Sequence, residues 1–188
     1  MDTMQFHQAL DEFGRRVERV PADRWASPTP CEDWDVRALV NHIVGELRWM
    51  PPILDGKTIA EVGDRFDGDL LGEDPVTTYR SAMSDALEAC KRPGVLGNTV
   101  HLSFGDVPGT EYLGQVTSDL TIHSWDLARG AGLDARLDRE LVGAVYEFMA
   151  PQADAWRGAG VFGPPVEVAK DADAQERLLA ITGRSPNA

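Results

Sequence analysis

Apolar residues recur at intervals of three and four along most of this chain. The clearest examples are the segments 34–49 and 110–128. Their apolar positions fall on one side of a helix when each residue advances about 100° around the axis. These positions are Leu39, Ile43, Leu47, Val116, Leu120 and Leu127. Because a helix with one apolar face must bury that face against another element, the pattern predicts helices packed on helices.

Three further segments have the same period: 4–20, 76–91 and 138–156. Asp33 is expected to cap the second helix, and Pro51 with Pro52 to end it. Asp74 and Pro75 favour the start of the third helix, and the alternation in NTVHLSF indicates one short hairpin or edge strand. The sequence therefore predicts an all-α protein, an antiparallel bundle of at least four helices with short extra helices and at most a small β element.

The length of 188 residues suits a single domain, so we expect residues 1–188 to form one helical-bundle unit. The net charge of −13, without a concentrated basic patch, argues against nucleic acid and anionic lipid as partners. The N-terminus contains acidic residues and no long apolar run, which predicts a cytoplasmic protein with no membrane anchor. In a reducing compartment, Cys31 and Cys90 are expected to be free thiols.

An acid and a histidine share the inward face of the segment 110–128. Asp119 and His123 are four residues apart, so they lie beside each other on one side of a helix. A carboxylate and an imidazole at this spacing can bind one metal ion, although such pairs are also common as buried hydrogen-bonded contacts.

His42 lies at the edge of the apolar face of the segment 34–49, with Glu46 one turn further on. If this helix packs beside the helix 110–128, His42 can reach Asp119 and His123. Three protein ligands would then leave an open position for water or substrate. A buried hydrogen-bonded cluster without metal remains an alternative.

The other chemically active residues are weaker candidates. His7 and His101 fall at positions expected to be on the surface. Cys31 precedes the second helix, but no base lies beside it in sequence, so we expect a small, buried apolar residue and not a nucleophile. No catalytic residue can be assigned, although Glu46, Arg48 and Arg129 are near the candidate ligands in sequence.

Two stretches, TPCEDWDVRALVNHIVGELRW (29–49) and VPGTEYLGQVTSDLTIHSWDLARGAG (107–132), allow a comparison with a known family. They resemble the metal-binding domain of mycothiol-dependent maleylpyruvate isomerases, in the DinB/YfiT-like superfamily. The chain looks most like the short, single-domain actinobacterial members, and the matching segments extend over about residues 4–179.

This resemblance implies an antiparallel four-helix bundle that holds a divalent metal, zinc first and nickel second. The matching ligand positions are His42, Asp119 and His123. The isomerases have glutamate where this chain has Asp119, and they add a C-terminal domain that contributes to the substrate pocket. Isomerisation of maleylpyruvate itself is therefore not expected here.

The resemblance leaves two kinds of function. One is a metal-dependent enzyme of transferase or isomerase type that joins a low-molecular-weight thiol such as mycothiol with a small electrophile. The alternative is a non-catalytic metal-binding or small-ligand-binding protein. Homodimer formation is left open.

Overall fold

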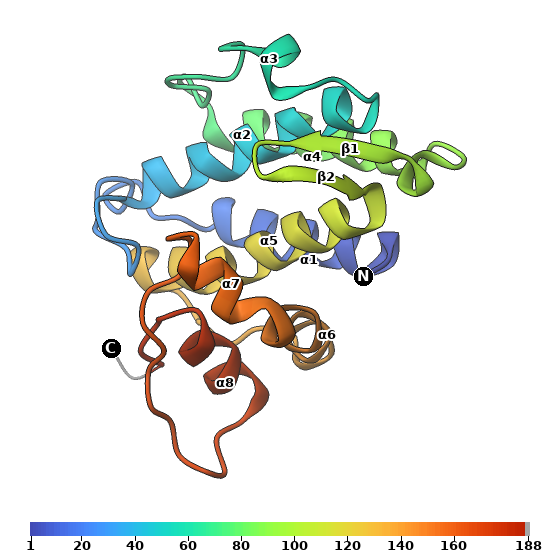
Figure 1. Ribbon diagram of the computed structural model, residues 1–188. Coiled ribbons are helices and arrows are strands. Elements are labelled where there is room, and N and C mark those ends of the chain that lie inside the picture. The colour runs from blue at the N-terminus through green and yellow to red at the C-terminus, as the bar shows by residue number, and fades with distance from the viewer. Residues whose placement is uncertain (187–188) are drawn as a thin grey trace. The chain divides into compact units, whose positions relative to one another are not determined.

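The structure, a computed structural model, describes residues 1–186 and is mostly helical, as the sequence predicts (Figure 1). The described residues divide into two compact units, one from Met1 to Ala135 and the other from Arg136 onward. The first unit contains all three residues of the candidate metal site.

Four long helices make up most of the first unit. They are α1 (Thr3–Val17), α2 (Val36–Leu54), α4 (Pro75–Lys91) and α5 (Gly109–Ala131). α1 packs against α4 and α5, and α2 packs against the same two helices, so each helix has two neighbours in a four-helix bundle. The six apolar positions singled out in the sequence, from Leu39 to Leu127, are all buried in this core.

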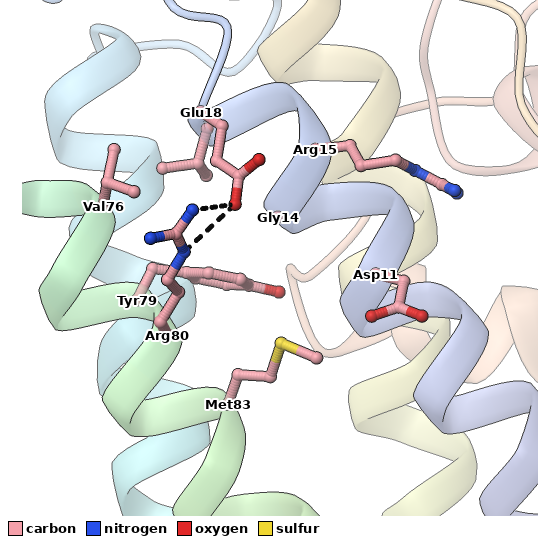
Figure 2. Close-up of a pocket in the computed structure, with 9 residues that line it drawn as sticks. Asp11, Gly14, Arg15, Glu18, Val76, Tyr79, Arg80 and Met83 are labelled. Carbon is pink, nitrogen blue, oxygen red and sulfur yellow. Dashed lines mark hydrogen bonds and ion pairs between the residues drawn. The ribbon is translucent and has the colours of Figure 1, made fainter.

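Neighbouring helices run antiparallel in two of these pairs. Along the α1/α4 pair, Val76 lies near Glu18 and Met83 lies toward Asp11 (Figure 2). In the α2/α5 pair, Val36 at the start of α2 lies against Gly130 near the end of α5, and His42, further along α2, meets Asp119 near the middle of α5.

α2 and α4 instead run in the same direction. Their C-terminal ends meet in an ion pair between Asp55 and Arg92, while Arg37 in the first turn of α2 bonds Asp69, shortly before α4 begins. Parallel neighbours need a connection that returns along the length of the bundle. This requirement explains the long segment between them, which contains only the short helix α3 (Ile59–Val62).

The start and end of α2 differ from the prediction. Asp35, not Asp33, caps the helix by accepting a hydrogen bond from Ala38 N, while Asp33 adopts a positive φ of 67° in the preceding turn. Pro51 and Pro52 lie inside the last turn and do not end the helix. Buried apolar residues continue beyond the prolines to Leu54, and their burial offsets the two missing N–H groups.

The other local predictions for this unit are confirmed. Asp74 caps α4, and Pro75 occupies its first turn. The predicted hairpin consists of β1 (Thr99–Leu102) and β2 (Gly105–Pro108), which pair antiparallel and contact α2 and α5. A 3-10 turn, η1 (Val95–Gly97), precedes the hairpin. α5 ends where Gly132 adopts a left-handed conformation with φ 71°.

The second unit begins with α6 (Arg139–Met149), followed by the 3-10 turn η2 (Ala150–Gln152) and α7 (Ala153–Gly158). The periodic segment 138–156 is therefore not one continuous helix but is interrupted near Pro151. α8 (Ala174–Ile181) packs against α6. Among the helices in the described part of the chain, none combines the length and apolar character that crossing a bilayer requires.

Candidate functional site

α2 and α5 bring the three predicted ligands together. His42 Nε2 lies 3.0 Å from Oδ2 of Asp119, and His123 Nε2 lies 3.3 Å from Oδ1 of the same carboxylate. The candidate ligand atoms of the three residues all lie within 4.8 Å of one another. Asp119 thus presents one oxygen to each imidazole.

This arrangement fits a divalent ion. In a tetrahedral zinc site, bonds of about 2.0–2.1 Å place neighbouring nitrogen and oxygen ligands about 3.3 Å apart. The two nitrogen–oxygen distances at Asp119 are close to that spacing. Two imidazoles and one carboxylate also match the ligand types of zinc sites that keep an open fourth position. The same distances are those of hydrogen bonds, so the geometry is equally compatible with a cluster without metal.

The three groups strongly affect one another electrostatically. Burial alone would raise the pKa of Asp119, but the positive charges of His123 and His42 and hydrogen bonds from both hold it well below its usual value. Burial would lower the pKa of His123, but Asp119 and further hydrogen bonds raise it well above its usual value. Asp119 is therefore an ionised acceptor at neutral pH, and an ion that binds His123 Nε2 must displace a proton.

One side of the cluster is open. The side chains of His42 and Asp119 are 27% and 36% exposed, while His123 is only 8% exposed. The Trp34 ring lies against both imidazoles, with its centroid 4.6 Å from that of His42 and 5.7 Å from that of His123. A ligand can therefore approach from the side of His42 and Asp119, next to an aromatic surface.

A hydrogen-bonded loop between α1 and α2 positions Trp34. Thr29 Oγ1 donates to the carbonyl oxygen of Trp34 at 2.8 Å, and the Cys31 amide donates to Thr29 Oγ1 at 3.2 Å. The Trp34 amide in turn donates to the carbonyl oxygen of Cys31 at 3.1 Å. These bonds fix Cys31 and Trp34 beside the candidate ligands, just before α2 begins.

Asp126 and Cys31 also belong to the cluster, although the sequence did not predict them there. Asp126 is fully buried, and its Oδ2 lies 2.9 Å from Nδ1 of His123. The Cys31 thiol donates to the same oxygen at 3.2 Å and lies 3.7 Å from His123 Nδ1. The i,i+3 spacing of His123 and Asp126 was a usable signal for this contact, but nothing in the sequence connects Cys31 with His123, 92 residues away.

The remaining sequence candidates differ in their positions. Glu46 interacts electrostatically with all three candidate ligands, and burial together with the charge of Asp119 raises its pKa. Arg48 instead lines a groove between α2 and α4, and Arg129 lies over the Trp125 ring, 5.8 Å from its centroid. His7 is on the surface, as expected.

Cys31, His123 and Asp126 form a second group of possible metal ligands, with ligand atoms within 4.8 Å of one another. This group uses Nδ1 of His123, whereas the group with His42 and Asp119 uses Nε2. The two groups therefore share one imidazole but predict different effects of substitution at Cys31.

A separate pocket of about 410 Å³ lies between α1 and α4 (Figure 2). Tyr79 forms part of its lining and donates a hydrogen bond to the carbonyl oxygen of Leu10 at 2.7 Å. Arg80 bonds Glu18 across the two helices at 2.6 Å. These contacts hold α1 to α4, and the pocket shares no residue with the His42 cluster.

The bundle and the cluster together define a helical protein with a candidate divalent-metal site between α2 and α5. Residues 6–128 match the model of the mycothiol maleylpyruvate isomerase N-terminal domain. The chain therefore belongs to this family, as its sequence resemblance indicated.

The chain is also similar to two relatives over almost its whole length and to two solved structures. Two Mycobacterium tuberculosis proteins, "Uncharacterized protein MT0763" and "Uncharacterized protein Rv0738", are each 31% identical to the chain, covering 98% of it and 99% of their own length. A crystal structure of the mycothiol-dependent maleylpyruvate isomerase superposes with a TM-score of 0.59 at 14% identity. A mutant of that enzyme gives 0.60 at 15%. Both matches cover 84% of this chain and 70% of the isomerase, and they show a shared fold.

Proposed function

We propose that this protein binds one divalent metal ion through His42, Asp119 and His123. In this proposal, it is a metal-dependent enzyme that acts with a low-molecular-weight thiol such as mycothiol. It either transfers the thiol to a small electrophile or uses the thiol to isomerise that electrophile. The observation that carries the proposal is the convergence of three ligand atoms within 4.8 Å from two different helices.

The ligand types favour zinc, with nickel as the second choice. Imidazole suits both ions, and two imidazoles with one carboxylate are a common catalytic zinc set. When bound there, such an ion supplies a positive site that favours the thiolate form of a thiol. Family membership supports the thiol, because the related isomerase is mycothiol-dependent by name.

The surrounding residues have definable roles in such a reaction. The exposed edges of His42 and Asp119 leave room for a small molecule, and Trp34 borders that approach. Glu46 has a raised pKa in the metal-free protein and interacts electrostatically with all three ligands, which makes it a candidate proton donor near them.

A non-catalytic metal-binding or small-ligand-binding protein is the second candidate. Two observations favour it: Arg48 lines a groove that includes none of the candidate ligands, and Arg129 lies over the Trp125 ring. A third interpretation is a purely structural cluster in which Asp119 bonds both histidines without an ion.

Elemental analysis of the purified protein and of four variants separates these functions. His42→Ala and His123→Ala should abolish stoichiometric zinc or nickel, while His7→Ala and His101→Ala should retain it. Equal metal content in all four variants would refute the ligand assignment, and a wild type without metal would favour the structural cluster.

Thiol chemistry is then tested on the metal-loaded wild type and His123→Ala. Calorimetry with mycothiol measures binding, and a panel of small electrophiles measures turnover. Metal-dependent turnover supports the enzyme. Metal binding without any thiol binding or turnover moves the conclusion to the non-catalytic protein, and undiminished turnover in metal-free His123→Ala removes the mechanism.

A further inference from the structure

Asp126 contacts the candidate site from its buried side. Its side chain is fully buried, and Oδ2 lies 2.9 Å from Nδ1 of His123, the nitrogen that faces away from Asp119. Both residues belong to α5, three positions apart, so the helix itself sets the contact.

A histidine can bind an ion through Nε2 only if that nitrogen has a free lone pair. The remaining ring proton must then be on Nδ1, where an acceptor favours this tautomer and fixes the ring plane. Histidine ligands in metal sites almost always have such a partner on the second nitrogen, often a carboxylate.

We propose that Asp126 is the positioning residue of this site. It holds Nδ1–H of His123 so that Nε2 points to the ion shared with His42 and Asp119. The proposal rests on the proposed metal-binding function but concerns a residue that does not itself touch the ion.

The loop before α2 completes this support. The Cys31 thiol donates to Oδ2 of Asp126 at 3.2 Å, so the carboxylate is held by groups from two separate segments of the chain. A buried carboxylate is costly unless its oxygens are hydrogen-bonded, and these donors offset that cost. Cys31 is then an auxiliary donor whose loss matters less than the loss of Asp126.

The competing interpretation is that Cys31, His123 and Asp126 themselves bind the ion. The two interpretations make opposite predictions for Cys31. As a metal ligand, Cys31 is required as strictly as His42 is in our proposal. As a donor to Asp126, it can be replaced by alanine with only a modest loss of zinc affinity.

The test measures zinc affinity of the metal-stripped full chain by competition with a chelator. Asp126→Asn should lower the affinity about 10-fold, and Asp126→Ala up to about 100-fold, the range typical of such outer partners. Cys31→Ala should cost less than Asp126→Asn. Asp85→Ala, on the exposed surface of α4, is the matched control and should leave the affinity unchanged.

A spectroscopic measurement separates positioning from general loss of structure. Nitrogen-15 NMR of the zinc-loaded protein should show His123 as a single Nδ1–H tautomer in wild type and in Cys31→Ala. In Asp126→Ala, at saturating zinc, the protected, downfield signal of the His123 Nδ1 proton should be lost. The melting temperature of the metal-free variant should match that of metal-free wild type, which would exclude unfolding as the cause.

Each outcome decides between the possibilities. If Asp126→Ala binds zinc as tightly as wild type, the positioning role is wrong although the metal site stands. If Cys31→Ala loses zinc as completely as His42→Ala, the proposal is overturned in favour of the second ligand group. A wild type that binds no zinc overturns the proposed function as well.

Discussion

His42 Nε2 lies 3.0 Å from Oδ2 of Asp119, although 77 positions separate the two residues in the chain. The contact connects α2 to α5, and the other oxygen of the same carboxylate faces His123 at 3.3 Å. Asp119 is therefore shared between two imidazoles, and its length and charge determine how closely they can approach a common ion.

Asp119→Asn should keep the fold and reduce zinc affinity at least about 100-fold. The amide retains the shape of the side chain but lacks the negative charge that balances the ion, and this change affects a direct ligand, so it should exceed the loss expected of an outer partner. Asp119→Glu should bind zinc at least as tightly as wild type, because it keeps the negative charge and supplies the longer carboxylate that the sequence resemblance implies for this position. Chelator competition measures both affinities.

Asp106→Asn is the control for this pair of variants. Asp106 bonds His101 in the exposed β1–β2 hairpin at 2.7 Å, so the substitution breaks another aspartate–histidine contact away from the cluster. Zinc affinity should not change. If Asp119→Asn likewise retained the wild-type affinity, Asp119 could not be a ligand.

Glu46→Gln should stabilise the metal-free protein at neutral pH. Burial first, and then the charge of Asp119, raise the pKa of Glu46 above its ordinary value of 4.5. Wild type therefore loses stability as the pH rises from that ordinary value through the raised folded-state value, because the folded state resists ionisation. Glutamine cannot ionise and avoids this loss, so the variant should melt at a higher temperature than wild type at neutral pH.

Thermal melts over a pH series check this result. The difference between variant and wild type should be small in acid, where Glu46 is protonated in both states, and should grow toward neutral pH. Glu88→Gln, on the exposed surface of α4, provides the matched control and should give no such trend. A constant difference at all pH values would contradict the role of Glu46 ionisation.

The helical fold and its core could be predicted because they depend on local periodicity. Leu39, Ile43 and Leu47 recur at helical spacing and are buried as expected. The same spacing placed Asp119 beside His123, so the prediction that His42 joins them needed only the packing of α2 on α5.

The remaining features depend on contacts between distant segments or on competition between local effects. Cys31 lacks a base nearby in sequence but meets His123 because the loop before α2 folds back onto α5. Pro51 does not stop α2, because burial of the residues that follow outweighs the lost hydrogen bond. The parallel direction of α2 and α4 also depends on tertiary packing, which periodicity within one helix cannot report.

Gly130→Ala should destabilise the protein by about 1–3 kcal/mol through overpacking. A Cβ at this position of α5 would lie 2.9 Å from methyl carbons of Thr29 and Val36 and 3.1 Å from the carbonyl oxygen of Pro28. These atoms belong to the loop that positions Cys31 and to the first turn of α2, so the loop must shift or the helices must separate.

Gly143→Ala is the matched control in α6. A Cβ there meets nothing within 4 Å, and alanine favours a helix, so this variant should be as stable as wild type or more stable by up to about 1 kcal/mol. Chemical denaturation measures both variants. Equal stabilities for the two would show that the loop accommodates the added methyl group.

The two cysteines should differ in their reaction with iodoacetamide under native, mildly alkaline conditions. Cys90 is 3% exposed, and burial, only partly opposed by the charge of Arg92, raises its pKa to about 12. Since the thiolate is the reacting species, Cys90 should remain unmodified. Cys31 is only partly buried and should be carboxamidomethylated, as peptide mass spectrometry can show.

Modification of Cys31 should in turn impair metal uptake. The Cys31 sulfur lies 3.2 Å from Asp126 Oδ2 and 3.7 Å from His123 Nδ1, so an added carboxamidomethyl group must displace the hydrogen bond between those residues or push the loop away from α5. Alkylated wild type should therefore bind zinc with an affinity about 10-fold lower, or lower still.

Cys31→Ser is the control for this experiment. It retains a donor to Asp126 and has no thiol at this position, so its zinc affinity should be the same before and after iodoacetamide treatment. If alkylated wild type and untreated wild type bind zinc equally, His123 does not depend on the buried contact with Asp126. If Cys31→Ser loses affinity on treatment, the reagent acts at another residue.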